Sequence, residues 1–448
     1  QVTSTTVSEA KTIGCFQIES PGMRATLREI NAKQVEDIMA ALALYRPGPL
    51  RGGLRDAFVR RFRGEEPVSH IHHSLKDLLG NTLGVILYQE QVLRIANELG
   101  GLSIAQGDIL RRAMSHLDPG HEMDTLRQNF IIGATKHKDI PIETAEQIWE
   151  MMAAFAGYGF PKAHAASYAK LAWNSAWCKT HFPAEFMSAV LGFGGGYYSQ
   201  RVYLMEARRL GLTINPPHIN HSHHRFRVSY PKGKPTLYMG LNQVHSLTQE
   251  TIQTIIQNRP FNSLEDFIIR VDPHKKEAQH LIMCGALEGL TTIPDGLDRI
   301  EYRRTPGQMQ LFSTSNAPDD WDLKLKNDAQ REVLGVSLAM SPLEQYSDQI
   351  QSAGAVSTLE AQNLVGARVT IVGMRQTWRR FKTRSNQIMG FLTLEDMDGS
   401  LHVIISPLLY RRYHLHLRES GPFLIEGLIE QDSDQNRIRM IAEKLTML

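Results

Sequence analysis

The chain has 448 residues, of which 42% are hydrophobic and 21% are charged, and its formal net charge is +2. This is an ordinary globular composition, and the length predicts about two to four domains. No apolar run approaches the roughly 20 residues that a membrane-spanning helix needs. The small net charge excludes a globally basic protein, so any surface that binds nucleic acid must be local.

Three cysteines are present, Cys15, Cys178 and Cys284, and they lie far apart without a Cys-x-x-Cys pair. This spacing predicts neither a disulfide framework nor a zinc site, and it fits a reducing cytoplasm. The sequence starts without a signal peptide, so we expect a cytoplasmic protein. Its first residue is Gln rather than Met, so we also expect a fragment of a longer protein.

Residues 1–190 are predicted to be almost entirely helical, because apolar residues recur there at helical spacing. A short strand is expected at 15–18, where polar and apolar residues alternate. Ser20 is the expected cap of the next helix, with Pro21 at its first position. Further helices are expected at 34–44, from Gly107, from Thr144, at 166–180, from Pro183 and at 197–211.

An arginine-rich segment lies at 46–63, with six arginines against a single acid, Asp56, and with Phe58 and Phe62 among them. Arginine suits phosphate because its planar group donates hydrogen bonds in pairs and stays charged. A solvated helix face is the alternative interpretation of such a charge run. The lack of compensating acids within the segment favours phosphate, and the predicted DNA contacts are Arg46, Arg51, Arg55, Arg60 and Arg61.

A turn rich in glycine and aromatic residues lies at 155–168, where one predicted helix ends and the next begins. Pro161 fits the start of the second helix. Lys162 and His164 would then lie near a helix N-terminus, where backbone N–H groups and the helix dipole favour an anion. The pattern is equally compatible with a phosphate-contacting turn and with a plain helix–helix connection that carries a solvated lysine.

Residues 230–290 contain two similar segments in which a short hairpin accompanies a helix, at 239–258 and at 278–287. Paired helices joined by a glycine hairpin commonly present backbone N–H groups to DNA phosphates. The first segment lacks the Gly-x-Gly that is typical of such hairpins. Four histidines precede it at a spacing that matches no standard metal site, so no metal is predicted there; they are His218, His221, His223 and His224.

Residues 291–330 have the Pro, Gly, Asp and Ser content of a linker. Within it, Leu311 and Phe312 form an apolar pair shortly after Gln308. An exposed Leu–Phe pair in a polar linker has little core to bury it, so we predict that it docks into a pocket of a partner protein. The alternative is that the pair holds the linker against its own domain.

From Gly366 onward the pattern changes to alternating strands. Five strands with a helix after the third are the order of an OB-fold barrel. The expected strands are 369–373, 389–394, 401–405, 423–430 and 437–442, with the helix at 407–417.

The first hairpin of this barrel interleaves basic and aromatic residues, which fits single-stranded nucleic acid because charge follows the backbone and rings stack on bases. The alternative, an exposed basic hairpin, leaves a bare tryptophan without a role. The predicted contacts are Arg375, Trp378, Arg379, Arg380, Phe381, Lys382 and Arg384.

Several motifs occur in one order along the chain. They are Gly14-Cys-Phe-Gln-Ile-Glu-Ser20, Tyr45-Arg-Pro-Gly-Pro49, Tyr88-Gln-Glu-Gln91, Leu110-Arg-Arg-Ala-Met114, Phe155-Ala-Gly-Tyr-Gly-Phe160 with His164, and Pro183-Ala-Glu-Phe186. Together they resemble the fingers region of the bacterial DNA polymerase III alpha subunit, a C-family DNA polymerase. The resemblance continues over nearly the whole chain.

This resemblance implies a multidomain α+β protein, the C-terminal portion of a DNA-directed DNA polymerase of replicative or error-prone type. It implies mainly helical fingers, a tandem helix-hairpin-helix domain that grips duplex DNA, and an OB-fold barrel near the single-stranded template. The corresponding ranges are 1–192 for the fingers with the end of the palm, 193–292 for the helix-hairpin-helix domain, 293–350 for a linker with a sliding-clamp motif, and 351–448 for the barrel.

The resemblance also implies roles for individual residues. Cations of the fingers would face the triphosphate of the incoming dNTP, and the histidine would lie beside its sugar or base. These nucleotide-binding residues are Arg111, Arg112, Tyr158, Lys162, His164 and Tyr168. Gln308, Leu311 and Phe312 fall where the family has its clamp motif. The implied partners are primer–template DNA, single-stranded DNA, the sliding clamp and other replisome or repair subunits.

Two departures from the family pattern suit a divergent or error-prone homologue. Residues 115–117 read Ser-His-Leu where the family commonly has Gly and lysines, and residues 244–247 of the first hairpin lack the usual glycines. An alternative function is a non-catalytic DNA-binding adaptor, made of helix-hairpin-helix and OB-fold modules and tethered to the sliding clamp.

A polymerase needs carboxylates that hold two metal ions about 4 Å apart. The family supplies these from a palm upstream of the fingers, so we expect the Mg²⁺ ligands outside this chain and no polymerisation by the chain alone. Asp396 and Asp398 have a suitable spacing, but they are interpreted as an acidic hairpin turn.

Overall fold

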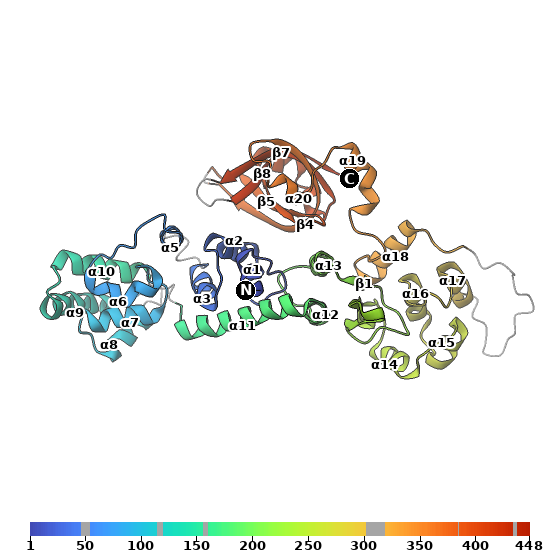
Figure 1. The fold of residues 1–448 in the computed structure, drawn as a ribbon, viewed down its shortest axis with the longest axis horizontal. Coiled ribbons are helices and arrows are strands. Elements are labelled where there is room, and N and C mark those ends of the chain that lie inside the picture. Colours follow the sequence, from blue (N-terminus) through green and yellow to red (C-terminus); the bar gives the residue numbers. More distant parts are fainter. Residues whose placement is uncertain (46–53, 114–119, 156–159, 302–318, 384, 433–436) are drawn as a thin grey trace, which may run out of the picture. The chain divides into compact units, whose positions relative to one another are not determined.

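A computed structural model describes the chain except for residues 46–53, 114–119, 156–159, 302–318, 384 and 433–436. The chain folds as two compact units, Gln1–His181 and Phe182–Leu448. The described part of the first unit is helical, and the second unit combines helices with a small sheet and a barrel (Figure 1). The predicted α+β class, mainly helical at the start and ending in a β-barrel, is confirmed.

The first helices of the first unit start at the residues that cap them. Ser20 accepts a hydrogen bond from Met23 N, and Pro21 occupies the first helical position, as predicted. Gln34 and Asp37 form a capping box at the next helix. These helices are α1 (Val2–Ser8), α2 (Pro21–Glu29) and α3 (Val35–Leu44), and α1 and α3 pack against α11 (Lys162–His181).

The loop before α2 consists of turns, so the predicted strand at 15–18 is wrong. Thr12 Oγ1 donates to Ile18 O at 2.6 Å, and the Glu19 carboxylate accepts from Gly14 N at 2.8 Å. These local bonds satisfy backbone groups inside the loop, where a strand would need a partner outside it.

Lys179 of α11 fixes this loop to the helix. Its side chain is buried, and its ammonium donates to Lys11 O and Ile13 O at 2.9 and 2.8 Å. A buried ammonium is costly unless its donors are paired, so the two carbonyl groups and the lysine hold one another in place.

A second group of helices in this unit surrounds a core of large apolar side chains. Phe130 and Trp149 lie in this core with their ring centroids 5.6 Å apart. Glycine permits a close crossing here, because a Cβ on Gly133 would lie 1.8 Å from Gly100 O. The helices are α6 (Lys76–Leu79), α7 (Gln89–Glu98), α8 (Ile104–Ala113), α9 (Gly120–Lys138) and α10 (Ile142–Ala154). Helix α5 (Leu54–Phe62) precedes them in the chain, and its described side chains are not part of this core cluster.

Two of these helices begin earlier than predicted. Helix α8 begins before Gly107 because Ser103 and Gln106 cap each other's backbone amides, with donor–acceptor distances of 2.9 and 3.2 Å. Helix α10 likewise begins before Thr144, at the residue that follows Pro141.

The second unit begins with helices and a three-stranded sheet. β1 (Thr213–Asn215) pairs in parallel with β3 (Thr236–Tyr238), and β2 (Arg227–Ser229) pairs with β3 in the antiparallel sense. Strands of three residues are too short to show an alternating pattern, so the sequence does not predict them. The helices are α12 (Pro183–Phe193), α13 (Gln200–Arg209), α14 (Gln249–Asn258), α15 (Leu264–Val271), α16 (Lys275–Met283), α17 (Ile293–Glu301) and α18 (Leu323–Leu334).

The linker predicted at 291–330 is corrected, because α17 and α18 occupy much of its described part. Pro294 lies in the first turn of α17, and Asp322 caps α18 by accepting from Leu325 N at 2.8 Å. Proline and aspartate are favoured at helix starts as well as in loops, so their abundance does not distinguish the two.

Five strands close into a barrel in the order β4-β5-β6-β8-β7. The predicted five strands and the helix after the third are confirmed, and this is the arrangement expected of an OB-fold. Leu392, Phe423 and Ile425 lie in the barrel core. The elements are α19 (Ser347–Ser352), α20 (Thr358–Ala361), β4 (Arg368–Lys382), β5 (Ile388–Glu395), β6 (Ser400–Ile405), α21 (Pro407–Tyr413), β7 (Phe423–Asp432) and β8 (Arg437–Met447).

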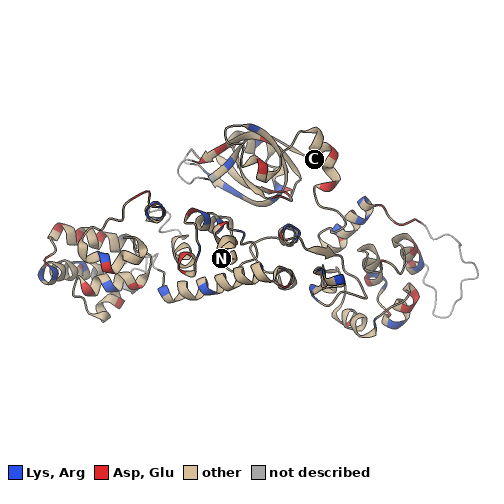
Figure 2. Ribbon diagram, viewed as in Figure 1, with Lys and Arg blue, Asp and Glu red and all other residues tan. Residues whose placement is uncertain are grey.

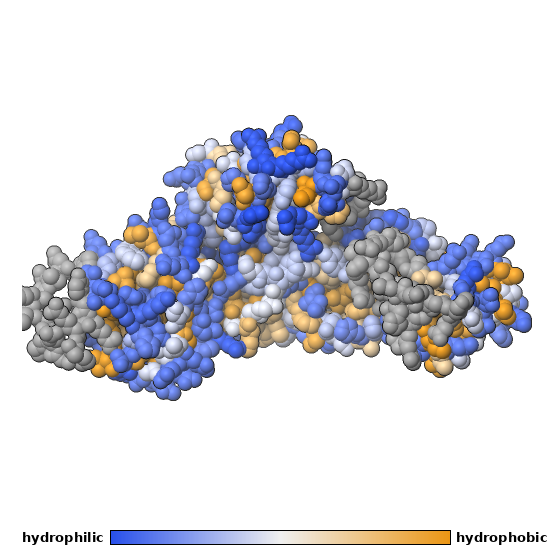
Figure 3. Space-filling model, turned by 180° about the vertical axis from the view of Figure 1, so that it is seen from behind, coloured by the Kyte–Doolittle hydropathy of each residue, from blue (hydrophilic) through white to orange (hydrophobic). Residues whose placement is uncertain are grey.

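Charged residues of both signs are interspersed along the helices of both units (Figure 2). On the face shown in Figure 3, hydrophobic residues form small groups among hydrophilic ones. Within the described ranges, no helix is both long enough and apolar enough to cross a membrane.

A buried carboxylate joins α13 to the barrel. Glu395 of β5 is fully buried, and it pairs with Arg201 at 2.8 Å and with Arg209 at 3.2 Å. Gln376 donates to the same carboxylate at 3.0 Å. Burial lowers the pKa of Arg201, and the attraction of Glu395 opposes that shift. One carboxylate therefore balances two guanidinium groups inside the second unit.

We predict that Glu395→Ala destabilises the second unit by about 3 to 5 kcal/mol, because it leaves the desolvated Arg201 guanidinium without its counter-charge and removes one of the two carboxylates that pair with Arg209. Chemical denaturation of wild type and variant measures the difference. The matched control is Glu430→Ala, since Glu430 is a half-exposed barrel glutamate 3.8 Å from Arg439, and its loss should cost about 1 kcal/mol or less. Equal losses in the two variants would contradict this account of Glu395.

Candidate nucleic-acid and nucleotide interface

Phe160, just before α11, makes a strand-like contact with the segment before α7. Tyr88 and Phe160 form a parallel bridge, in which Gln89 N donates to Phe160 O at 3.0 Å. The buried side chain of Gln91 accepts from Tyr88 N at 3.0 Å and so fixes the segment that makes this bridge. The Tyr-Gln-Glu-Gln motif and Phe160, far apart in sequence, therefore meet in space.

The N-terminus of α11 is occupied by a carboxylate of the protein itself. Both oxygens of Glu90 accept from Lys162 N at 2.9 Å. The carboxylate satisfies an amide that the helix leaves unpaired, and it matches the positive end of the helix dipole. The anion-favouring position predicted from the sequence is thus filled by Glu90. An external anion would meet the side chains of Lys162 and His164 instead of this amide.

Lys162 and His164 are exposed at the start of α11 beside a row of aromatic rings. The ring centroid of His164 lies 5.3 Å from that of Phe160 and 4.0 Å from that of Tyr168. The Lys162 ammonium lies 5.9 Å from the centroid of the Tyr88 ring. Burial raises the pKa of Tyr88, so its hydroxyl stays protonated at neutral pH. Of the predicted residues, the structure therefore brings His164 and Tyr168 together, and it places Lys162 over the Tyr88 ring nearby in the same helix end.

Phe16 extends this row, and the sequence did not assign it to the site. Its ring centroid lies 5.3 Å from that of Tyr168 in an edge-on arrangement, and 41% of the residue is exposed. Its backbone N donates to Ser175 Oγ on α11 at 3.1 Å. Phe16 belongs to the motif at 14–20, and this motif is the sequence feature from which its place in the site could have been predicted.

Several predicted site residues lie outside the described part of the chain. Arg111 and Arg112 belong to the last turn of α8, but their side chains are not described. The other predicted site residues outside the described part of the chain are Arg46, Arg51, Tyr158, Gln308, Leu311, Phe312 and Arg384.

The structure corrects the prediction that Arg55 contacts DNA. Arg55 is 5% exposed, and it pairs with Glu29 and, at 3.0 Å, with Asp56. Its guanidinium therefore balances acids within the fold and is too buried to reach a DNA phosphate.

Arg60 and Arg61 are also compensated by an acid, which lies just beyond the arginine-rich segment. Both pair with Glu66, at 2.9 and 3.0 Å. Their hydrogen bonds lower the pKa of Glu66, which therefore keeps its negative charge. The prediction that these two arginines lack a compensating acid is wrong, because Glu66 lies just beyond the segment 46–63.

The first hairpin, residues 240–247 before α14, keeps a tight turn without glycine at its end. Ser246 has a φ of 66°, in the left-handed region that favours glycine. His245 N donates to Val333 O at 3.0 Å, and the His245 ring contacts Glu332 O at 3.1 Å. One backbone donor of this hairpin, His245 N, is therefore hydrogen-bonded within the protein.

A carboxylate also joins the starts of α14 and α16. The side chain of Glu277 accepts from Thr248 N at 2.8 Å and from His274 N at 3.0 Å. Burial acts to raise the pKa of Glu277, but the hydrogen bonds, foremost those from Thr248, outweigh it and lower the pKa. Glu277 therefore stays charged and ties the two helices together.

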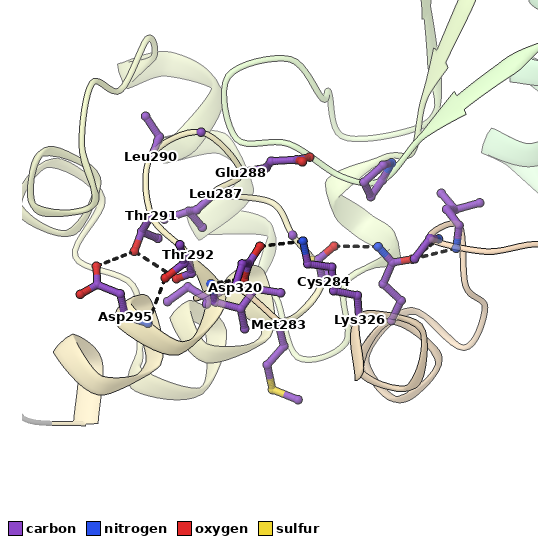
Figure 4. Close-up of a pocket in the computed structure, with 18 of the residues that line it drawn as sticks. Met283, Cys284, Leu287, Glu288, Leu290, Thr291, Thr292, Asp295, Asp320 and Lys326 are labelled. Atoms are coloured by element: carbon purple, nitrogen blue, oxygen red, sulfur yellow. Dashed lines mark hydrogen bonds and ion pairs between the residues drawn. The ribbon is translucent and has the colours of Figure 1, made fainter. Parts of the chain in front are cut away.

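The second hairpin, residues 284–290 between α16 and α17, has the glycines that the first one lacks. Gly285 and Gly289 have φ values of 87° and 81°. The hairpin lines a pocket of about 640 Å³, in which Asp320 accepts from Ile293 N at 2.9 Å (Figure 4). Asp320 also pairs with Lys326 at 2.6 Å. The N-terminus of α17, like that of α11, is thus occupied by a carboxylate of the protein.

The four histidines at 218–224 engage neighbours within the fold. His218 Nδ1 accepts from Asn220 N at 3.1 Å, and its Nε2 lies 3.1 Å from Glu288 O. Burial lowers the pKa of His218, so its ring is neutral at pH 7. In the residues that the structure describes, no group of three or more His, Cys, Asp or Glu side chains could hold a metal ion.

One outer face of the barrel combines cationic and aromatic side chains. Arg379 of β4 lies opposite Phe391 of β5, and Phe381 lies opposite Met389. Phe381 is 58% exposed and Phe391 is 43% exposed. Arg379 donates to Tyr197 Oη at 2.8 Å. Phe391 was missed by the sequence analysis, although its cross-strand position follows once the hairpin register is known.

Two residues of the predicted barrel interface face inward or bond within the fold. Trp378 is partly buried against the barrel core, and a Cβ on Gly390 would lie 2.1 Å from its ring. The half-buried Arg375 donates to Leu417 O at 2.9 Å and to Arg418 O at 3.0 Å. Trp378 therefore has a packing role rather than the exposed one predicted for it, and Arg375 fastens the barrel. Arg380 and Lys382 are exposed.

The interpretation of Asp396 as part of a turn agrees with its contacts. Asp396 is buried, and its carboxylate accepts from Thr358 N at 2.6 Å, from Asp398 N at 2.9 Å and from Gly399 N at 2.8 Å. With its oxygens engaged by backbone amides, Asp396 is a poor metal ligand.

Comparison with known proteins agrees with this geometry. Residues 1–138 match the model of the bacterial DNA polymerase III alpha subunit finger domain, and residues 211–294 match a helix-hairpin-helix motif. The chain is 31% identical to the DNA polymerase III subunit alpha of Vibrio cholerae over 98% of its own length. It is 32% identical to the same subunit of Thermus aquaticus over 99% and to the error-prone DNA polymerase of Corynebacterium glutamicum over 98%.

The chain spans 41%, 38% and 42% of the lengths of these three relatives, respectively. The matched finger model includes the loop that carries Phe16, the Tyr-Gln-Glu-Gln motif and α8, and the second match includes both hairpins. The chain therefore belongs to the family of the bacterial DNA polymerase III alpha subunit.

Proposed function

We propose that the chain is the portion of a DNA-directed DNA polymerase that positions primer–template DNA and the incoming dNTP during replication or repair synthesis. The observation that carries the proposal is the exposed end of α11, where the Lys162 ammonium lies over the Tyr88 ring and His164 stands beside the rings of Phe160 and Tyr168. A cation suits a triphosphate, and aromatic rings suit a sugar or base. Membership of the family supports the same assignment.

At this site, Lys162 would pair with the triphosphate while His164 and Tyr168 lie along the sugar and base. Glu90 fixes the helix end, so Lys162 and His164 keep their orientation before a nucleotide arrives. The family resemblance adds Arg111, Arg112 and Tyr158 to this proposed site.

Polymerase chemistry requires Mg²⁺ held by carboxylates. The candidate carboxylate with suitable spacing, Asp396, is engaged by the amides of its own turn and does not fit that role. We therefore propose that the Mg²⁺ ligands come from the part of the relatives' length that this chain does not span.

We further propose four functional parts. The fingers are assigned to 1–192, a helix-hairpin-helix domain that contacts duplex DNA to 193–292, a helix-containing segment with the clamp-binding motif to 293–350, and an OB-fold for single-stranded template to 351–448. A bacterial cytoplasmic location follows from this assignment. Other replisome or repair subunits would join through the complete polymerase.

A DNA-binding adaptor tethered to the sliding clamp is the second candidate. One observation favours it: the arginines of α5 are compensated by acids, which weakens the case for DNA contacts in the fingers. Binding of a dNTP at α11 discriminates the two, because an adaptor has no need of it.

We predict that Phe381→Ala with Phe391→Ala weakens binding of single-stranded DNA by about 1 to 3 kcal/mol per ring, because each exposed ring offers a stacking surface. Fluorescence anisotropy with a labelled oligothymidylate measures the change. The control is Arg368→Ala, since Arg368 lies on the same barrel and pairs with Glu443 at 3.1 Å. Unchanged affinity in the double variant would remove the barrel face from the proposed function.

We predict that Leu311→Ala with Phe312→Ala abolishes recovery of the sliding clamp in a pull-down, because the pair would fill an apolar pocket of the clamp. The control is Leu323→Ala, which changes an exposed leucine outside the motif. If the double variant recovers as much clamp as wild type, the tether proposed at Gln308, Leu311 and Phe312 is refuted.

A further inference from the structure

Two arginines of the second unit converge on one histidine. Arg259 Nη2 lies 3.1 Å from His223 Nε2, and Arg227 Nη1 also bonds to this ring. Arg259 is fixed in this position because its Nη1 donates to Ser222 O at 2.8 Å. We refer to His223, Arg227 and Arg259 as the Arg–His cluster.

The Arg–His cluster holds positive charges together without a negative partner. Within the described ranges, no ion pair includes Arg227 or Arg259. Burial, followed by the nearby guanidinium groups of Arg227 and Arg259, lowers the pKa of His223, so the ring is neutral and acts as an acceptor. Burial and the charge of Arg227 also lower the pKa of Arg259. Two like charges around a neutral ring leave an electrostatic demand for an anion.

Two other arginines in the same part of the chain, Arg270 and Arg299, are compensated by acids. Arg299 pairs with Glu265 and, at 3.0 Å, with Asp295. Arg270 pairs with Asp266 at 3.1 Å. The lack of an acid at the Arg–His cluster is therefore a local feature and not the general condition of this domain.

The cluster is attached to the first hairpin by backbone hydrogen bonds. Leu241 N donates to His223 O at 2.9 Å, and Asn242 N donates to His224 O at 3.0 Å. A Cβ on Gly240 would lie 2.6 Å from the backbone of Arg225, so the two segments are in close contact. The hairpin thus carries the cluster at its side, while its own His245 amide is bound to Val333 O.

We propose that His223, Arg227 and Arg259 form a binding site for a phosphodiester group of duplex DNA, beside the first hairpin. In this site the guanidinium side chains donate the hydrogen bonds that a glycine hairpin would donate from its backbone. The proposal rests on the proposed DNA-binding function of this domain and names one of its contacts.

The chemistry of the cluster fits a phosphodiester. Each guanidinium can donate two parallel hydrogen bonds to the oxygens of one phosphate. Arg227 is exposed, so it can meet a phosphate at the surface, and Arg259 is half-buried and held by Ser222. The neutral His223 ring keeps the two guanidinium groups close in the absence of DNA. Less side-chain conformational entropy is therefore lost when a phosphate binds.

The test compares duplex DNA binding by wild type and by Arg227→Ala with Arg259→Ala over a series of salt concentrations. Removing two phosphate contacts should lower the slope of log affinity against log salt by about 1.8, since each contact contributes about 0.9. Fluorescence anisotropy with a labelled 20-base-pair duplex measures both affinity and slope. Far-ultraviolet circular dichroism and the melting temperature report whether the variant is folded.

Two further variants make the result specific. Arg299→Ala removes an arginine of the same domain that has its own acids, and its slope should equal that of wild type. Arg227→Lys with Arg259→Lys keeps both charges, so it should restore the slope even if the alanine variant is unstable.

The outcomes separate this inference from the broader proposal. If wild type does not bind duplex DNA, the proposed function of the domain fails. If wild type binds and the folded alanine variant shows the same slope, the Arg–His cluster is not a phosphate site. If the lysine variant shows the same lowered slope as the alanine variant, the positive charge of the cluster does not contribute to DNA binding and the inference is overturned.

Discussion

The proposed nucleotide site at the start of α11 depends on the hydrogen bond between the Glu90 carboxylate and the first amide of that helix. It joins the Tyr-Gln-Glu-Gln motif to the first residue of α11, and it fixes the helix end from which Lys162 and His164 project. The same device recurs in the second unit, where Asp320 occupies the start of α17 and Glu277 the starts of α14 and α16. Because these helix ends carry the protein's own carboxylates, an anionic ligand is left to cationic side chains.

Compensation of charge decides which of those side chains are available. Arg55 and Arg61 form ion pairs with acids, and Glu395 forms ion pairs with two arginines of α13. A chain with a net charge of +2 can still bind DNA if its uncompensated cations are local. The Arg–His cluster beside the first hairpin and the exposed end of α11 are such places. The aromatic face of the barrel adds stacking surface to the cationic residues of β4.

The sequence predicted elements whose signals are local. The barrel strands, their helix and the start of α2 follow from alternation, periodicity and capping residues, and they agree with the structure. It failed where the deciding partner lies elsewhere in the chain. Arg55 was assigned to DNA because Glu29 is 26 residues away, and Trp378 looked exposed because only the register of β4 with β5 turns it inward. Residues 15–18 alternate like a strand, but side-chain bonds fold them into turns.

The central claim is that the exposed end of α11 faces the incoming nucleotide. Its most direct test is equilibrium binding of a dNTP to the chain loaded on primer–template DNA in the presence of Mg²⁺. Loss of a charged hydrogen bond costs about 1.5 kcal/mol or more, so Lys162→Ala should weaken binding about tenfold or further. Lys170→Ala, which changes another exposed lysine of α11, should bind as wild type does. Equal affinity of wild type and Lys162→Ala would contradict the account.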